Sequence, residues 1–469
     1  MGKKISEIEE FSNQNSSIRL LGYDPSSNKV GTVPLSAITS KTAYCGCRWK
    51  KAESKSEGEP FGDLTMLANL PSILGLGGYL VRNDHSRRKL SPNNHKLFAS
   101  GGVAALDGSM GHYQWGWNIP WYYAHWEDDI YECEAISPAP IAGHWNYKIP
   151  VASMSCSGAA ALDRTNLILV SFCKRTAQYR GGDNKPDNDT KWNTLLGKPV
   201  VDVAEDKLQQ YAEKNGARWG ASMYMMVFAL GALTRIIFHN RNIQAPYKAA
   251  LTAEGLRQGG LGNGIDYVID DFGKQYATLD IDALAERGDA TGVFSVTIPK
   301  GDGTNKTINY IPMFFGLKNW YQYIYMMMHG CAVQATSSKT LDVYALKKWT
   351  SSPVDTTGVS KFTKIGSIPA TSASEASWLY SKRMNLDNMI AYPLEFGGSG
   401  STYYCDGFYH PAITSGVRGL AAFCYASFGS TAGSCALNAN FGLTVSYVCC
   451  GAFLCEADED WDTEAFYVA

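Results

Sequence analysis

The feature that most restricts the fold is an almost continuous apolar stretch at residues 221–238. Arg235 interrupts it near its end, and the stretch is too short and too polar there to span a bilayer. A helix that is apolar on every face has to be buried, so the rest of the chain must pack around it. Residues 207–215 are amphipathic and Gly216 follows them, and we predict helical structure across residues 202–238.

From residue 276 onward the pattern changes to short strands and turns. Residues 300–306 form a polar, glycine-containing turn between apolar runs at 294–298 and 307–311, which is typical of a β-hairpin. Helix in one part of the chain and short strands in the next predict an α+β fold.

Charge and cysteine usage exclude several classes of protein. A net charge of −2 over 469 residues provides no basic surface for nucleic acid or for an anionic membrane. The 12 cysteines follow neither a disulfide framework nor zinc-site spacing, and the 8 histidines form no metal-ligand motif. We therefore expect no metal, no cofactor and no nucleic-acid partner. The polar N-terminus lacks the apolar core of a signal peptide, and we expect no membrane insertion.

Three regions are predicted along the chain, at residues 1–40, 41–160 and 161–469. The first has two apolar runs, at 18–21 and 30–33, around a turn at 24–28. The second is expected to be loop-rich and contains a cluster of tryptophans, namely Trp115, Trp117, Trp121, Trp126 and Trp145. Such a cluster either packs in a core or between subunits, or it stacks on sugar rings, and the residues leave both readings open.

A stretch near the C-terminus excludes five residue types. Residues 401–455 contain no Lys, Glu, Gln, Met or Trp, and they are rich in Cys, Tyr, Phe, Ser, Ala and Gly. These five types share one property: no codon that ends in a pyrimidine encodes them. Randomising the adenines of asparagine codons gives only pyrimidine-ending codons. The stretch therefore has the composition that mutagenesis of adenines would produce.

Three segments, taken in order, resemble one family. They are residues 236–244, residues 315–325, and a C-terminal set with Arg418, Ala432-Gly433, Asn438, Asn440, Ser446 and Gly451-Ala452. In order and spacing they resemble the C-type-lectin-like, formylglycine-generating-enzyme-type fold of the variable proteins of diversity-generating retroelements. The chain departs from the family pattern at His239-Asn240, at Tyr321-Gln322 and at Phe453. These departures put individual contacts in doubt.

The resemblance implies a C-type-lectin-like domain within residues 161–469 and a mutable segment at about 416–455. The residues expected to vary and to bind ligand are Phe423, Cys424, Tyr425, Phe428, Ser430, Ser434, Phe441, Val445, Tyr447 and Cys449. The residues expected to hold the scaffold of this segment are Arg418, Gly433, Asn438, Asn440 and Gly451. Phe, Tyr, Val and Cys also suit buried strands, which is the alternative for the first set.

The N-terminal segment resembles the attachment segments of phage tail-fibre and baseplate-attached proteins. The resemblance rests on a lead at residues 3–8 and a closing sequence at 31–38, and a plain hairpin is the alternative. Together the resemblances imply a non-enzymatic receptor-binding protein of a phage virion tail. It would bind a bacterial surface protein or glycan, contact other tail proteins through its N-terminus, and assemble as a homotrimer.

Two other functions remain open from the residues. A polysaccharide-degrading tail enzyme would use acids such as Glu127 and Asp129, although three adjacent acids at 127–129 are more typical of a solvated turn. A purely structural tail component would owe its C-terminal composition to coincidence.

Overall fold

A computed structural model of the chain describes residues 19–24, 29–34, 43–265, 279–350, 358–459 and 461–469. The chain divides into two compact units, Met1–Ala43 and Tyr44–Ala469. In the first, β1 (Arg19–Asp24) pairs with β2 (Lys29–Pro34) in an antiparallel hairpin, with Arg19 opposite Pro34. The two predicted strands are confirmed. The lead at 3–8 and residues 35–38 of the closing sequence lie outside the described residues.

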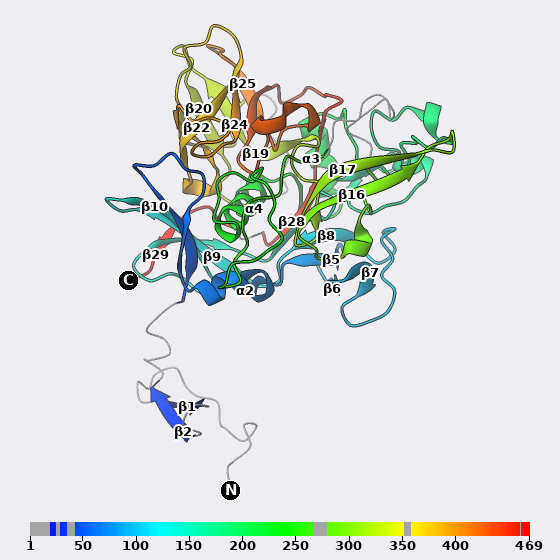
Figure 1. Cartoon of the computed structure of the whole chain (residues 1–469). Helices are drawn as coiled ribbons and strands as arrows, with labels where there is room; N and C mark the ends of the chain where they lie inside the picture. The colour runs from blue at the N-terminus through cyan, green and yellow to red at the C-terminus, as the bar shows by residue number, and fades with distance from the viewer. Residues whose placement is uncertain (1–18, 25–28, 35–42, 266–278, 351–357, 460) are drawn as a thin grey trace. The chain divides into compact units, whose positions relative to one another are not determined.

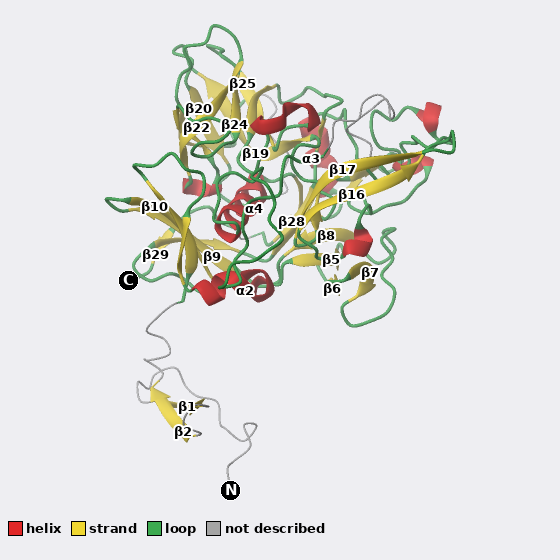
Figure 2. Ribbon diagram, in the orientation of Figure 1, coloured by secondary structure: helices red, strands yellow, loops and turns green. Residues whose placement is uncertain are grey.

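The predicted buried helix is confirmed and lies at the centre of the second unit. Helix α4 (Tyr224–Ile237) is buried along its whole length, and it contacts strands of all three large sheets. Figure 2 shows it as one of few helices among many strands. The amphipathic stretch forms a separate helix, α3 (Glu205–Glu213). Gly216 has a left-handed φ of 130°, and the short strand β15 (Trp219–Ala221) follows it, so the predicted helix is interrupted here.

Strands make up 39% of the chain and helices 13%, so the fold is mostly β-sheet with few helices and is compatible with the α+β or the mainly-β class. Three large sheets carry most of the strands. The six-stranded sheet has the order β29-β11-β9-β10-β3-β4, with β3 Cys45–Lys50, β4 Glu59–Gly62, β9 Trp121–Glu127, β10 Tyr131–Ser137, β11 Trp145–Ile149 and β29 Phe466–Tyr467. The seven-stranded sheet has the order β15-β28-β12-β8-β5-β6-β7, with β5 Gly77–Val81, β6 Arg87–Ser91, β7 Asn94–Phe98, β8 His112–Gly116, β12 Ala152–Ser155 and β28 Leu454–Ala457.

The third sheet contains three strands of the predicted mutable segment, namely β25, β26 and β27. Its order is β21-β20-β19-β25-β26-β24-β22-β23, and β27 pairs with β19 beside this path. The bounds are β19 Tyr325–Ala335, β20 Leu341–Ala345, β21 Thr363–Ile368, β22 Ser377–Asn385, β23 Tyr392–Phe396, β24 Gly407–His410, β25 Val417–Ala422, β26 Leu437–Phe441 and β27 Cys450–Gly451. Figure 1 shows β19, β24 and β25 close together above α4.

Smaller elements complete the unit. Strand β13 (Ala161–Asp163) pairs with β14 (Ile168–Val170), and β16 (Gly292–Pro299) pairs with β17 (Asn305–Phe314), which also pairs with β18 (Leu317–Lys318). The β16–β17 hairpin confirms the predicted turn at 300–306. Helix α2 (Leu64–Leu74) begins at Asp63, whose side chain accepts a hydrogen bond from the Met66 amide at 2.9 Å. Short 3-10 helices are Ala177–Tyr179, Pro186–Asn188, Ala285–Arg287, Asp387–Met389 and Ala426–Thr431, the last labelled η7.

The expected middle region at 41–160 is not separate from the rest of the chain. Strand β12 pairs with β28, so residues 152–155 share a sheet with residues 454–457. The region is also built mainly of strands and one helix instead of loops. Its tryptophans supply core: Trp115, Trp117 and Trp121 are fully buried, whereas Trp145 is exposed. In the described residues, no helix has both the length and the apolar character needed to cross a membrane.

Candidate functional site

Aromatic side chains from the predicted mutable segment and its neighbours form a continuous array on the nine-stranded sheet. Each ring lies within contact distance of the next. We call the array the aromatic face, and its members are Tyr325, Trp378, Tyr409, Tyr425, Phe428, Phe441 and Tyr447.

Tyr325, at the start of β19, is the centre of this array. Its ring centroid lies 5.4 Å from that of Tyr425, 5.2 Å from that of Phe441 and 6.1 Å from that of Phe428, with the first two pairs edge to face. Tyr325 itself is buried, so it forms the floor on which the outer rings rest. Edge-to-face pairs of this kind are a favourable arrangement of aromatic rings.

The loop between β26 and β27 carries the exposed part of the aromatic face. Tyr447 is 42% exposed, and its ring packs 5.1 Å from that of Phe441. Val445 and Val448 in the same loop are 36% and 39% exposed. Three neighbouring apolar side chains at the surface of one loop are unusual for a loop that only connects strands.

The remaining predicted ligand-binding residues divide into two groups. Ser430 is exposed, and Tyr425, Phe428 and Cys449 are half-buried around Tyr325. The structure therefore brings Tyr425, Phe428 and Cys449 together around Tyr325, and Tyr447 joins them through Phe441. Phe441 was also expected at the surface, but it is buried, and it forms part of the floor of the aromatic face because it packs against Tyr325.

The expectation that Phe423, Cys424 and Ser434 are displayed is wrong, because all three are buried. Strand β25 ends at Ala422, and the next two residues take left-handed backbone angles, with φ of 74° at Phe423 and 59° at Cys424. The Phe423 amide then donates to the carbonyl of Ala436 at 3.0 Å. This turn directs the side chains of both residues into the interior.

Three residues of the expected scaffold, Asn438, Gly433 and Gly451, make close contacts with their surroundings. Asn438 Nδ2 donates to the Tyr325 hydroxyl at 3.1 Å, and its Oδ1 accepts the backbone N–H of Asn440 at 2.9 Å. A Cβ atom at Gly433 would lie 1.8 Å from Asp406 Oδ1, and one at Gly451 would lie 2.5 Å from the carbonyl oxygen of Val200. No larger residue fits at either position without movement of its neighbours.

The other two residues expected to hold the scaffold, Asn440 and Arg418, are more exposed than Asn438. Asn440 is exposed, so it is Asn438 that holds the turn between them. Arg418 is half-buried, and its guanidinium donates to the carbonyl of Val417 at 3.0 Å. It is also the one charged residue in the sequence 416–455.

A buried ion pair connects the scaffold to α4. Arg235 donates through NH2 to Glu134 Oε2 at 2.8 Å and through Nε to Glu134 Oε1 at 3.0 Å. Its third nitrogen lies 3.0 Å from Cys435 Sγ, next to the buried turn of the mutable segment. Both charged side chains are fully buried. The pair thus joins the six-stranded sheet, the central helix and the scaffold of the aromatic face.

The three adjacent acids at residues 127–129 lie exposed at the surface. Asp128 Oδ1 accepts the backbone N–H groups of Ile130 and Tyr131, both at 2.7 Å, as in a tight turn. Glu127 pairs with Arg383 at 2.9 Å, and Asp129 is exposed. This is the solvated turn that the sequence favoured.

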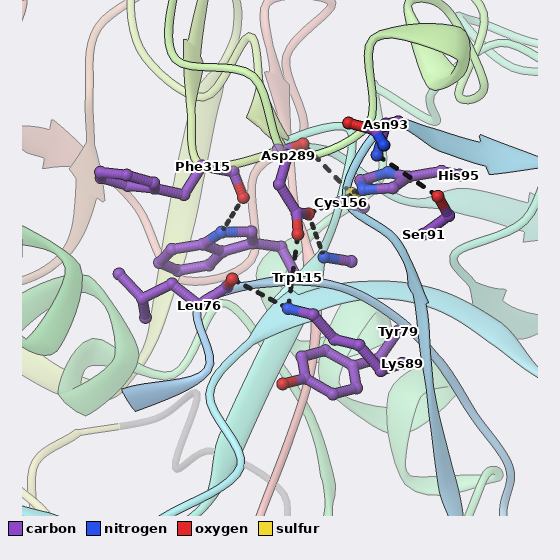
Figure 3. A network of polar contacts seen from close by, with 12 residues as sticks. Leu76, Tyr79, Lys89, Ser91, Asn93, His95, Trp115, Cys156, Asp289 and Phe315 are labelled. Atoms are coloured by element: carbon purple, nitrogen blue, oxygen red, sulfur yellow. Dashed lines mark hydrogen bonds and ion pairs between the residues drawn. The ribbon is translucent and has the colours of Figure 1, made fainter. Parts of the chain in front are cut away.

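The structure also contains a buried polar network that the sequence did not indicate (Figure 3). His95 Nε2 lies 2.8 Å from Asp289 Oδ1, and its Nδ1 lies 2.6 Å from the Tyr113 hydroxyl. Lys318 Nζ donates to the same hydroxyl at 2.6 Å and to Cys156 Sγ at 3.5 Å. The five residues are far apart in the sequence, so no local pattern could have revealed the network.

A cysteine, a histidine and an aspartate together could form an activated nucleophile. Here the Cys156 and His95 side chains are fully buried, and burial raises the pKa of the Cys156 thiol. Burial also lowers the pKa of His95 to about 4. A neutral thiol and a neutral imidazole without access to solvent favour a structural role for this network.

No family model matches the chain, and no curated protein is similar to it. Within the part of the chain that the structure describes, no three His, Cys, Asp or Glu side chains lie close enough to hold a metal ion.

Proposed function

We propose that this chain is a receptor-binding protein of a phage virion tail and that the aromatic face contacts a bacterial surface protein or glycan. The observation that carries the proposal is the convergence of Tyr425, Phe428 and Phe441 on Tyr325. Tyr447 packs on Phe441, and Val445 and Tyr447 are exposed. Tyrosine is enriched among the residues that dominate binding energy at interfaces. The same residues come from the stretch with the composition expected of adenine mutagenesis.

The proposal includes a C-type-lectin-like domain whose segment at about 416–455 is diversified. Support comes from the contrast between tightly packed and exposed positions within that segment. Asn438, Gly433 and Gly451 are fixed by contacts that no other residue would reproduce, whereas the exposed loop residues meet no such constraint. A rigid scaffold that tolerates change at its surface is what diversification requires, because substitutions in a core destabilise the fold. The N-terminal hairpin would attach the chain to other tail proteins, and a homotrimer would add avidity.

Adsorption of purified protein to host cells tests the binding role. Tyr447→Ala and Val445→Ser should each weaken cell binding, by about tenfold for Tyr447 if it is a binding hot spot. The matched control is Tyr467→Ala, since Tyr467 is 53% exposed but lies in β29, outside the mutable segment. Unchanged adsorption in both variants would leave a structural tail component as the better interpretation. Release of reducing ends from host polysaccharide, lost in Asp129→Asn, would favour the enzyme.

The genomic sequence tests the diversification separately. A near-copy of the segment should lie close to the gene, and the mismatches between the two should coincide with adenines of the copy. If no such repeat exists, the diversification part of the proposal is wrong, whatever the adsorption result.

A further inference from the structure

A cleft of about 660 Å³ lies beside the mutable segment and is not part of the aromatic face. Its walls come from the segment after α4, from the glycine-rich loop that includes Gly262, and from the middle of the β16–β17 hairpin. Figure 1 shows this hairpin projecting from the body of the second unit. Ligand sites in proteins typically enclose about 300–1,000 Å³, so the cleft has the size of a small-molecule site.

An irregularity in the hairpin shapes the cleft. Phe294 pairs with Ile311 and Val296 with Ile308, so Ser295 alone faces both Asn309 and Tyr310. This is a β-bulge, a feature that re-aims side chains next to functional sites. Tyr310 at the bulge has a φ of 60° and is 56% exposed. A large residue held in a left-handed conformation with its ring in solvent costs free energy, and a role in binding would explain why it stands there.

The polar groups of the cleft are neutral and held in place. The Ser295 hydroxyl donates to Asn309 Oδ1 at 3.0 Å, which fixes the Asn309 amide. The Tyr247 hydroxyl donates to the carbonyl of Thr291 at 2.9 Å, which holds that ring against the hairpin. Asn263 on the glycine-rich loop is exposed toward solvent. None of the described residues that line the cleft is charged.

Gln244 connects the cleft to the mutable segment. Its Nε2 donates to the carbonyl of Gly429 at 2.8 Å and to the carbonyl of Ala432, so the wall of the cleft supports η7 directly. The Oε1 atom of the same amide is buried and has no hydrogen-bond partner among the described residues. A hydroxyl group that reached this wall would satisfy an acceptor that the protein leaves unpaired.

We propose that this cleft binds a neutral saccharide at a fixed subsite beside the aromatic face. The Tyr247 and Tyr310 rings would lie against the apolar face of a sugar, and the amides of Asn263 and Asn309 with the Ser295 hydroxyl would bond to its hydroxyl groups. A carboxylated sugar would find no countercharge there. The subsite lies outside the stretch 401–455, so it would stay constant while the adjacent face changes. Saccharide binding in the cleft does not depend on the proposed function, whereas the constancy of the subsite rests on the diversification proposed there.

Calorimetric titration of the full-length protein tests the proposal. The probes are the neutral trisaccharides maltotriose, cellotriose, mannotriose and triacetylchitotriose, with trigalacturonic acid as the acidic comparison. At least one neutral probe should bind, and Tyr310→Ala and Asn309→Ala should each weaken that binding by about tenfold, the loss of one good contact. Tyr467→Ala is the matched control and should leave saccharide binding unchanged, since Tyr467 is 53% exposed on β29 and belongs neither to the cleft nor to the aromatic face.

The proposal is wrong if no neutral trisaccharide binds, if trigalacturonic acid binds better, or if binding survives both substitutions in the cleft. Circular dichroism of each variant checks that the fold is intact, which exposed positions such as Tyr310 favour. The result separates the two proposals, since loss of cell adsorption in Tyr447→Ala and loss of saccharide binding in Tyr310→Ala are independent measurements.

Discussion

At the scale of single residues, the predicted mutable segment contains glycines that differ in whether a side chain can be added. Gly433 lies against the buried carboxylate of Asp406, whereas a Cβ atom at Gly442 would meet only Val445, at an ordinary contact distance of 3.4 Å. Two glycines nine positions apart thus differ in the space available for a side chain, although composition alone does not distinguish them.

Substitution of these glycines tests the distinction. Gly433→Ala should lower the free energy of unfolding by about 1–3 kcal/mol, the usual cost of forcing extra volume into a packed site. Gly442→Ala is the matched control and should change it by less than about 0.5 kcal/mol, as is usual at surface positions. Urea unfolding followed by tryptophan fluorescence measures both. Equal stability of the two variants would contradict the scaffold role of Gly433.

At the scale of elements, the His95 network joins strands that are distant in the sequence. His95 lies on β7, Tyr113 on β8 and Lys318 on β18, so one cluster connects the seven-stranded sheet to the β16–β18 sheet. Burial, followed by the positive charge of Lys318, lowers the pKa of His95 to about 4. The folded state therefore favours the neutral imidazole.

Because the pKa of His95 is lower in the folded state, this residue makes the folded state less stable as the pH falls. In the unfolded chain His95 takes up a proton near its ordinary pKa of about 6.5, whereas in the folded state it stays neutral down to pH 4. Its contribution is therefore complete above pH 6.5 and is lost as the pH falls toward 4, up to about 3 kcal/mol. Urea unfolding at pH 7 and pH 4.5 should show a smaller difference in His95→Gln than in the parent.

The sequence predicted those elements whose structure depends on one local property of the chain. Residues 221–238 predicted α4 because a stretch that is apolar on all sides has one stable place, the core. The hairpins β1–β2 and β16–β17 followed from turn chemistry. The bulge at Ser295, the His95 network and the burial of Phe423 and Cys424 depend on contacts between distant residues. Periodicity contains no such information, so these features could not be predicted.

Within the candidate site, the sequence located the segment but did not show which of its side chains are exposed. The composition is a property of the whole stretch 401–455. It does not distinguish Tyr447, which lies in a loop, from Phe423, which lies in a buried turn. Tyr325 and Trp378 lie outside the stretch, so nothing in the composition assigned them to the aromatic face. Strand pairing in the third sheet is what brings them beside the mutable residues.

At the scale of the whole molecule, the division into two compact units predicts that residues 44–469 fold without the N-terminal hairpin. A fragment of residues 44–469 should have a thermal unfolding midpoint within about 2 °C of that of the full chain, since few contacts cross such a boundary. Under the proposed function it should still adsorb to host cells but should not be incorporated into tails. A clearly lower midpoint in differential scanning calorimetry would show that the hairpin stabilises the larger unit.

The pairing of β28 with β12 has a consequence for how the protein is made. The Leu454 amide donates to Ser155 Oγ, 299 positions earlier in the chain, so the seven-stranded sheet cannot close until residues 454–457 have been synthesised. Contacts of such long range form late in folding. Under the proposed function, a gene copy that acquired a frameshift within the diversified stretch would lose β28, which lies between β15 and β12 in this sheet. Only copies that keep their reading frame would then yield a folded protein, so the fold itself would act as a filter on the variants that a population displays.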